Sequence, residues 1–519
     1  MKGNKQITIL IALIVALGGL LMGFDASVIS GVVKFIEPEF QLTKLELGWS
    51  VASLTLTSTL AMMLAGPISD RIGRRAVLRY ASILYFLSAL GSAIAPDFLT
   101  LVIARMVGGF GVGASLILAP MYIAEIAPKD LRGRLVSFNQ LNIVIGISLA
   151  FFTNYAILQL ADSGEAWTID LGLNDNQWRW MLGLEAVPAI LYFFGLFIVP
   201  RSPRWLIMHG RFDEAQAVMA KIAGQEKALE ELDRIKKNIE EDSKKEDVGI
   251  GELFKPAMKL VLSIGIVVAV LQQITGINSV FFYAPMIFEQ SGLGTDAAFM
   301  QAILVGLVNL VFTVLAILFI DKLGRKPLLT GGVAGIFISM SVLAYGFYSA
   351  TYTLDAVDLQ QFVNTAPPEL QQLEGKTFES ELAFQDAVEQ YAGAPFYEEF
   401  KEPVLKAGIE LNTFLILSAI LAFVASFAIS IGPVMWVLFS ELFPNRIRGV
   451  AISFVGLINS AVSFLVQWVF PWELEVLGSG TTFLLYGLFA LAGLVFIIKV
   501  IPETKGRSLE ELERELVKE

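Results

Sequence analysis

The sequence contains no cysteine and only one histidine, His209, in 519 residues. The lack of cysteine excludes disulfides, thiolate metal sites and cysteine nucleophiles. A lone histidine outside the apolar runs excludes a buried histidine cluster and a Ser-His-Asp triad. Charge is also scarce, at 17% of residues against about 25% in a typical soluble domain. The 49 acidic residues outnumber the 38 basic ones, which argues against nucleic acid as a partner. We therefore expect neither an enzyme nor a metal site.

What the chain has instead is a series of long apolar runs. Each is long enough to cross a hydrocarbon core of about 30 Å as a helix that rises about 1.5 Å per residue. The fold class predicted is an all-α membrane protein with twelve transmembrane helices. The expected spans are 7–33, 47–69, 77–96, 98–124, 135–160, 179–200, 258–288, 297–320, 327–350, 410–440, 449–471 and 479–501.

The loops between these spans differ in charge. The alternate loops hold almost nothing basic beyond Lys34 and Lys44. The other set carries the basic residues Arg71, Arg74, Arg75, Arg79, Lys129, Arg132, Arg134, Lys322, Arg325, Lys326, Arg446 and Arg448. The positive-inside rule places this basic set, both termini and the charge-mixed stretch 201–256 in the cytoplasm. The sequence has no Asn-x-Ser/Thr sequon, in keeping with a bacterial inner membrane.

Two short motifs occur twice in the chain. Asp-Arg-Ile-Gly-Arg-Arg at 70–75 recurs as Asp-Lys-Leu-Gly-Arg-Lys at 321–326, and the segment 124–133 recurs in similar form at 440–449. Two six-helix halves related by a parallel repeat are typical of transporters that bind substrate near the midplane. The expected organisation is a first bundle at 1–200, linker helices at 201–256, a second bundle at 257–502 and a tail at 503–519.

The second half carries a surplus at 351–408 on the non-cytoplasmic side. Eleven acidic residues lie there against three lysines, so this insert supplies most of the net charge of −11. A lid and a partner-docking surface are both conceivable, but we expect a solvated appendage.

Several motifs resemble a known family. Gly-Pro-Ile-Ser-Asp-Arg-Ile-Gly-Arg-Arg at 66–75 is similar to the loop signature of the major facilitator superfamily. Segments 120–125, 272–278, 432–436 and 502–506 resemble the more specific marks of its sugar porters, most closely the bacterial proton-coupled xylose symporters. The resemblance implies two pseudo-symmetric six-helix bundles that import a pentose or hexose with a proton by alternating access. It implies no cofactor beyond the proton, and a monomer in the lipid bilayer.

Three ionisable residues lie inside the first six spans: Asp25, Arg105 and Glu185. A charged residue at a helix centre costs about 2.5–3.5 kcal/mol on insertion scales and usually faces a cavity or a partner. We expect Asp25 to carry the proton, paired with Arg105 while ionised. The resemblance agrees, because proton symporters have Asp here whereas facilitative carriers have Asn, and Glu185 matches a third member of the cluster. The alternative is a purely structural pair in a sugar uniporter. A sugar sensor is less favoured because the tail after Pro502 is short.

A sugar has many hydroxyls and no charge, so it calls for amide side chains, which donate and accept hydrogen bonds, and for an aromatic ring. Residues Gln272, Gly276, Ser279 and Tyr283 are spaced to share one helix face, and Gly276 allows that helix to break. Ser463 and Gln467 follow Asn459 on a neighbouring face. With the positions implied by the resemblance, the predicted substrate site is Gln140, Gln272, Gln273, Asn278, Phe282, Tyr283, Asn309, Gly432, Trp436 and Asn459.

Three departures from the xylose symporters concern this site. Ser460 replaces a Trp, Phe282 a Tyr and Ile147 a Gln. The site is therefore expected to be larger and to offer fewer hydrogen bonds, so a hexose is at least as well suited as xylose, and a disaccharide is conceivable.

The repeated motifs place opposite charges where helices end on the cytoplasmic side. A plain interpretation is helix capping; the resemblance favours a salt-bridge set that closes this side in the outward-facing state. Its expected members are Asp70, Arg74, Glu125, Arg132, Asp321, Arg325, Glu441 and Arg448. Arg201 stands where the family usually has Glu, which weakens one link. Glycines 108, 109, 111 and 113 look like a dinucleotide loop but lie within a span, so close helix packing is expected to explain them.

Overall fold

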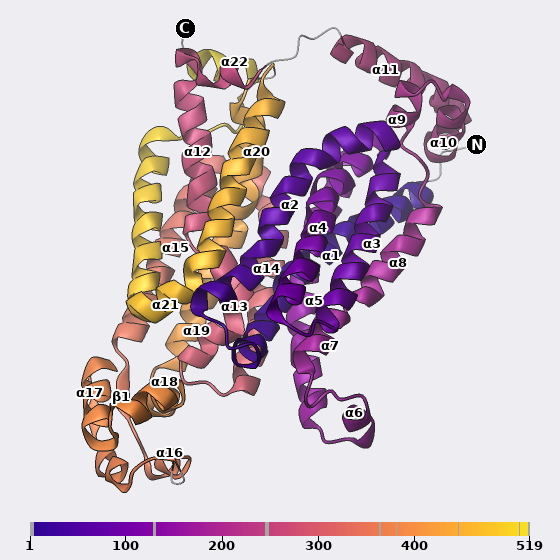
Figure 1. The fold of residues 1–519 in the computed structure, drawn as a ribbon. Helices are drawn as coiled ribbons and strands as arrows, with labels where there is room; N and C mark the ends of the chain where they lie inside the picture. Colours follow the sequence, from indigo (N-terminus) through magenta and orange to yellow (C-terminus); the bar gives the residue numbers. More distant parts are fainter. Residues whose placement is uncertain are drawn as a thin grey trace.

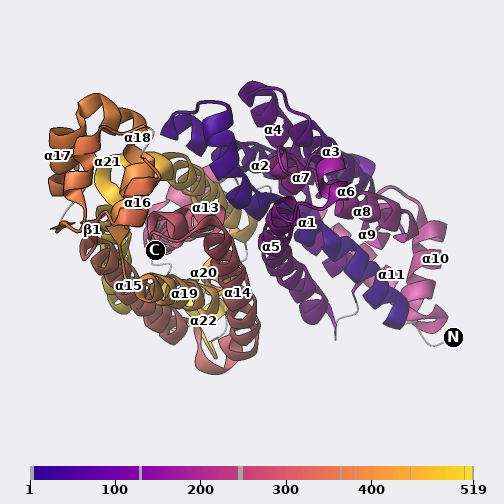
Figure 2. The same ribbon diagram turned by 90° about the horizontal axis from the view of Figure 1, so that it is seen from below.

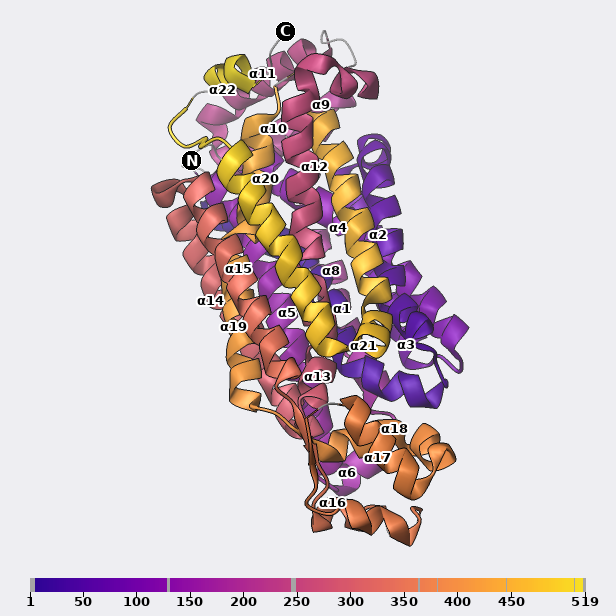
Figure 3. The ribbon, with the colours of Figure 1, turned by 90° about the vertical axis from the view of Figure 1, so that its left-hand side faces the viewer.

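Two bundles of long apolar helices stand side by side in the computed structural model (Figure 1). It describes residues 5–127, 131–243, 249–362, 365–379, 381–444, 446–507 and 509–516. Short helices after the first bundle lie at one end of the molecule, and the 351–408 insert lies at the other (Figure 3). We call these ends the linker face and the insert face.

The first bundle begins with α1 and ends with α8. Its helices are α1 (Lys5–Glu39), α2 (Lys44–Ile72), α3 (Arg74–Ala93), α4 (Phe98–Ile126), α5 (Arg132–Asp162), the short α6 (Ala166–Asp170), α7 (Gln177–Gly183) and α8 (Ala186–Ile198). Thr43 and Glu46 form a capping box at the start of α2, and Asp97 caps α4. The predicted sixth span is two helices, α7 and α8, that meet at Glu185.

The glycines of α4 confirm the packing interpretation. A Cβ at Gly109 would lie 2.1 Å from the Thr57 hydroxyl, and one at Gly113 would lie 2.1 Å from the Ser58 carbonyl oxygen. Only glycine therefore allows α2 and α4 to approach this closely.

The second bundle has the same number of crossings. Its helices are α12 (Lys259–Ile274), α13 (Ile277–Gln290), α14 (Thr295–Leu323), α15 (Arg325–Tyr348), α19 (Thr413–Ile429), α20 (Ile431–Leu442) and α21 (Arg448–Val500). Eleven described helices are long and apolar enough to span a membrane, and the last has 53 residues. At about 1.5 Å per residue it would be twice as long as a membrane is thick. Gly478, with φ 75°, divides it into two spans, which confirms the twelve expected.

Two spans of the second bundle are broken near their middle. Gly276 has φ 87° and separates α12 from α13, and a Cβ there would lie 2.3 Å from the Tyr486 ring. Ser430 separates α19 from α20. The left-handed turn at Gly276 is the break that the sequence allows at this glycine, and it reorients the chain, so Gln272 and Tyr283 do not lie on one continuous helix face.

The insert, which we expect to be a solvated appendage, is a small folded unit. It contains α16 (Ala356–Gln360), η3 (Pro368–Leu373), α17 (Glu381–Ala392), α18 (Ala394–Gly408) and a sheet of order β2-β1-β3, with β1 Thr351–Thr353, β2 Thr377–Phe378 and β3 Ile409–Glu410. Leu354, Leu373, Phe384, Val388 and Val404 are fully buried in its own core. These apolar residues are interspersed with acidic ones, so the composition of the segment did not indicate a hydrophobic core.

The linker face carries the remaining helices. They are α9 (Pro203–Met208), α10 (Phe212–Ala223), α11 (Gln225–Ser243), η1 (Ile250–Phe254), η2 (Pro256–Met258) and, in the tail, α22 (Leu509–Leu516). Leu512 and Leu516 of α22 are buried and belong to the same hydrophobic core as the helices of the second bundle.

The bundles touch through α1 and α13, α2 and α21, and α5 and α14 (Figure 2). Lys34 of α1 pairs with Glu289 and also donates a hydrogen bond to Thr295. Gln159 donates to Asp296 over 2.7 Å. These polar links lie at the ends of the helices nearest the insert face, so the bundles are closed on that side.

Candidate functional site

The three ionisable residues of the first bundle come together in its interior. Arg105 Nη1 lies 3.5 Å from Asp25 Oδ1, with both side chains 2% exposed or less. The Arg105 Nε–H donates to the Ser50 carbonyl oxygen over 3.0 Å. Glu185 is buried at the junction of α7 and α8 and interacts electrostatically with both Asp25 and Arg105. Arg105 of α4 thus links α1 and α2.

This cluster is not fully satisfied. Among the described residues, Asp25 Oδ2 and Glu185 Oε1 have no hydrogen-bond partner. One guanidinium cannot neutralise two carboxylates, and an uncompensated buried charge is expensive. The arrangement therefore favours binding of a proton by one of the two acids.

A second polar cluster lies in the second bundle, and it is made of amides. Asn459 of α21 donates to Gln272 Oε1 over 2.8 Å and accepts from Gln273 over 3.1 Å. Asn278 donates to Gln273 and to Ser463, each over 2.7 Å. We call Gln272, Gln273, Asn278, Asn459 and Ser463 the amide network. It contains no charge, as a site for a neutral polyhydroxyl ligand requires.

The other predicted substrate residues differ in their burial and in whether they contact the amide network. Gly432 joins the network because its carbonyl oxygen accepts from Gln272 over 3.3 Å. Trp436 is 47% exposed and so offers an open ring face, and Gln140 is exposed on α5. The structure does not bring Gln140 into a hydrogen bond with the amide network among the described residues.

Phe282, Tyr283 and Asn309 are all buried. Tyr283 is fully covered and donates its hydroxyl hydrogen to the Gln467 carbonyl oxygen over 3.0 Å. In this conformation Tyr283 therefore ties α13 to α21.

One residue of the first bundle reaches this region and was not predicted. Thr55 of α2 donates to Gln467 Oε1 over 2.8 Å, and Gln467 donates in turn to Ser463 over 2.7 Å. The sequence signal was weak, because Thr55 is one of several hydroxyl residues in the second span. Thr55 thus connects the first bundle to the amide network.

The repeated motifs form equivalent ion-pair sets on the linker face. Arg74 pairs with Asp70 over 2.8 Å and with Glu125 over 3.2 Å. Arg325 pairs with Asp321 over 3.1 Å and with Glu441 over 2.8 Å. Each set therefore lies within one bundle.

Arg448 and Arg132 are the remaining predicted members of these sets. Arg448 donates from Nε to the Phe443 carbonyl oxygen over 3.1 Å. The side chain of Arg132, like Lys129 before it, lies outside the described part of the chain.

Glu503 caps the start of α15. Its carboxylate accepts from the backbone N–H groups of Arg325 over 3.0 Å and Lys326 over 3.1 Å. Burial acts to raise the pKa of Glu503, but these donors and the N–H of Lys505 outweigh it and hold the pKa below its ordinary value.

We expect Glu503→Ala to destabilise the fold at pH 7 by about 0.5–2 kcal/mol, the usual loss for a helix cap. Because the folded-state pKa is lowered, the ionised carboxylate stabilises the fold near neutrality, and this contribution is lost as the pH falls through that pKa. The difference between variant and wild type should thus be smaller in acid, below the folded-state pKa of Glu503, than at pH 7. Thermal melting of the detergent-solubilised protein measures it, with Glu513→Ala on α22 as control. An equal deficit at both pH values would contradict the role of the charge.

Nearly the whole chain matches known sugar transporters. The family model described as "Sugar (and other) transporter" matches residues 11–357 and 403–516. The arabinose-proton symporter of Bacillus subtilis is 34% identical over 98% of this chain and 95% of its own. The D-xylose-proton symporter of Escherichia coli is 35% identical over 98% and 96%.

The fold agrees with that sequence similarity. The structure of the inward open conformation of the xylose transporter XylE from E. coli matches with a TM-score of 0.74 at 34% identity, over 98% of this chain and 99% of that one. These relatives are transporters. The chain belongs to the sugar transporter family of the major facilitator superfamily.

Proposed function

We propose that this protein imports a monosaccharide together with a proton by alternating access. The observation that carries the proposal is the buried Asp25–Arg105 pair in one bundle beside an uncharged amide network in the other. The names of the relatives, an arabinose-proton and a D-xylose-proton symporter, support it. No cofactor other than the coupling proton is needed, and no chemical step is involved.

The membrane orientation follows from the loop charges. The arginine-rich linker face is cytoplasmic in this proposal, with both termini on that side and the acidic insert outside. The protein is then a multi-pass protein of a bacterial inner membrane, and the described conformation opens toward the cytoplasm. The ion-pair sets of Arg74 and Arg325 would meet across the bundles when that side closes.

Coupling follows from the charge of Asp25. While ionised, its carboxylate attracts Arg105, which is also bonded to the Ser50 carbonyl oxygen of α2. A proton on Asp25 removes that attraction and frees α1 from α4. The same helix α2 carries Thr55, which reaches Gln467 and, through it, Ser463 of the amide network. Continuous contacts of this kind connect the acid cluster of the first bundle to the amide network of the second.

The substrate class follows from the amide network and from the three positions at which this chain differs from the xylose symporters. Amides and one exposed indole suit a neutral sugar ring, and no charged side chain takes part in the network. Compared with the xylose symporters, the site has less bulk at Ser460 and fewer polar groups at Ile147 and Phe282. A hexose is therefore proposed alongside a pentose.

The experiment is uptake into proteoliposomes with an acidic exterior and a panel of pentoses and hexoses. We expect sugar to accumulate above its external concentration, and a protonophore to collapse the gradient. A uniporter would only equilibrate the sugar, with no effect of the pH gradient, and that result would overturn proton coupling. The panel identifies the sugar independently, by counterflow.

A further inference from the structure

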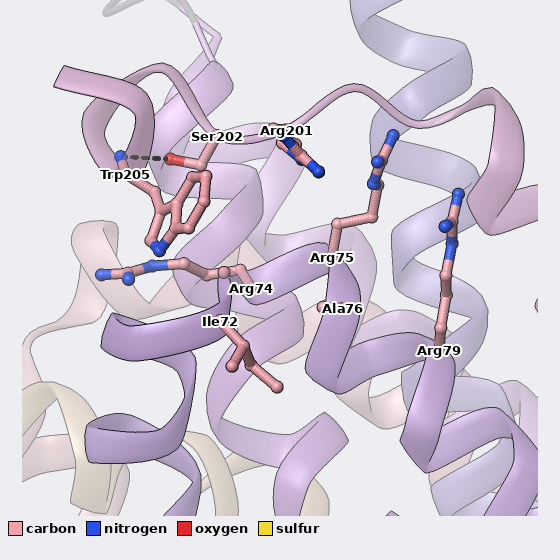
Figure 4. A pocket seen from close by; sticks show the side chains of 9 residues that line it. Ile72, Arg74, Arg75, Ala76, Arg79, Arg201, Ser202 and Trp205 are labelled. Atoms are coloured by element: carbon pink, nitrogen blue, oxygen red, sulfur yellow. Dashed lines mark hydrogen bonds between the residues drawn. The ribbon is translucent and has the colours of Figure 1, made fainter. Parts of the chain in front are cut away.

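A cavity of about 100 Å³ lies at the start of α3 on the linker face. Arg75 and Arg79 of α3 and Arg201, which precedes α9, all line it, and Ser202 and Trp205 form another wall (Figure 4). The guanidinium groups of these three arginines lie toward the same side, whereas Arg74 turns away from them. None of the residues that line the cavity is acidic.

The three charges are poorly neutralised. Arg75 donates to the Val199 carbonyl oxygen over 2.9 Å, and Arg79 donates to the Leu196 carbonyl oxygen over 3.1 Å. Arg79 Nε is buried without a hydrogen-bond partner among the described residues. Arg201 lies 3.9 Å from a carboxylate oxygen of Glu214, which also pairs with Arg211.

The second half of the chain shows what occupies the equivalent place. Ser202 and Thr504 correspond, because each donates its hydroxyl hydrogen to the motif glutamate of its own half, Glu125 or Glu441. One residue earlier, Glu503 therefore corresponds to Arg201. Glu503 binds the first N–H groups of α15.

The first half lacks that carboxylate. The start of α3 at Gly73 has no side-chain cap, and Arg201 brings a positive charge instead. The start of α15 thus has a carboxylate, whereas the equivalent start of α3 has none and instead lies beside three arginines.

We propose that this cavity binds a phosphate group, between the three arginines and the Trp205 ring, which packs against Gly73 as the Glu503 carboxylate packs against Gly324 in the other half. Phosphate suits backbone N–H groups at a helix start and the planar fork of arginine. At about 30 Å³ per water molecule, the cavity has room for a group of that size. The bound anion fastens the Arg201–Trp205 segment, and with it α9, to α3. Its source is a soluble phosphate or the headgroup of an anionic phospholipid, because the cavity lies at the end of a membrane helix.

The test is thermal melting of the full chain in detergent with sodium phosphate, against sodium chloride at equal ionic strength. A parallel arm adds phosphatidylglycerol or, as the zwitterionic reference, phosphatidylcholine. We expect phosphate or phosphatidylglycerol to raise Tm by about 2–4 °C near saturation. A shift with phosphate identifies a soluble anion as sufficient, and a shift with phosphatidylglycerol alone identifies the lipid headgroup.

Arg201→Glu restores the carboxylate of the other half and should abolish the shift, while it raises Tm in chloride. Arg201→Gln should weaken phosphate binding by about tenfold or more, because a charge-assisted hydrogen bond is lost. The control Lys221→Glu makes the same charge change on exposed α10 and should keep the shift. The proposal is overturned if neither additive raises Tm, or if Arg201→Glu and Lys221→Glu respond alike. None of these readouts depends on sugar or proton transport.

Discussion

Replacing Asp25 with Asn is expected to abolish sugar accumulation driven by a pH gradient while sugar exchange continues. Asn has the size of Asp but cannot release a proton, so the variant should behave as a uniporter with an accumulation ratio of about 1. In wild type the initial rate should fall as the external pH rises, whereas in the variant it should be independent of pH. Uptake and counterflow in the same proteoliposome preparation measure both.

Sugar exchange by the Asp25→Asn variant also distinguishes a role of Asp25 in proton coupling from a purely structural role. If the Asp25–Arg105 pair were only structural, the variant would remove one of the two acids beside Arg105, Glu185 being the other, and exchange would fall together with the stability of the fold. Glu39→Gln is the matched control, because Glu39 also lies on α1 and pairs with Arg179 at the insert face. A variant at Asp25 that still concentrates sugar would refute the assignment of the proton to this residue.

The second large effect is expected in the amide network. Asn459→Ala removes donors to Gln272 Oε1 and to the Ala269 carbonyl oxygen, and it leaves the Gln273 amide without one acceptor. Each unsatisfied buried group costs about 1–3 kcal/mol, so sugar affinity should fall by about 10- to 100-fold. Gln272→Ala should have a similar effect, and the double variant should lose less than the sum, because the two residues share one network.

Sugar affinity can be followed by intrinsic fluorescence, since the half-exposed Trp436 is expected to lie at the site, or by calorimetry. The control is Gln290→Ala at the other end of α13, where the amide accepts a hydrogen bond from Ser479 and does not touch the network. Unchanged affinity in both Asn459→Ala and Gln272→Ala would remove the amide network from the substrate site.

The sequence was sufficient for the spans and for the polar residues inside them. Apolar runs of membrane length have few alternative folds, so the number of crossings followed from their length and was confirmed. Asp25, Arg105 and Glu185 stood out because charge is so rare inside the spans, and the structure places them together. Amides are equally conspicuous there, so Gln272, Gln273 and Asn459 could also be named.

What the sequence did not reveal depends on contacts between distant segments. Gly276 indicated where the helix could break, but the Tyr486 ring that packs against this turn is more than two hundred residues away and could not be identified from the sequence. Thr55 gained its importance only from its approach to Gln467. The core of the insert escaped notice because its apolar residues are short of any membrane length and are diluted by acids.

The insert has one consequence for how this chain can vary. Strand β1, where the insert begins, pairs antiparallel with β3, where it ends, through Tyr352 and Ile409. The two ends of the unit are thus held next to each other, like the base of a stem, between α15 and α19. Such a stem lets the outer unit be shortened, exchanged or grafted while the membrane helices keep their positions, and the family match itself omits residues 358–402.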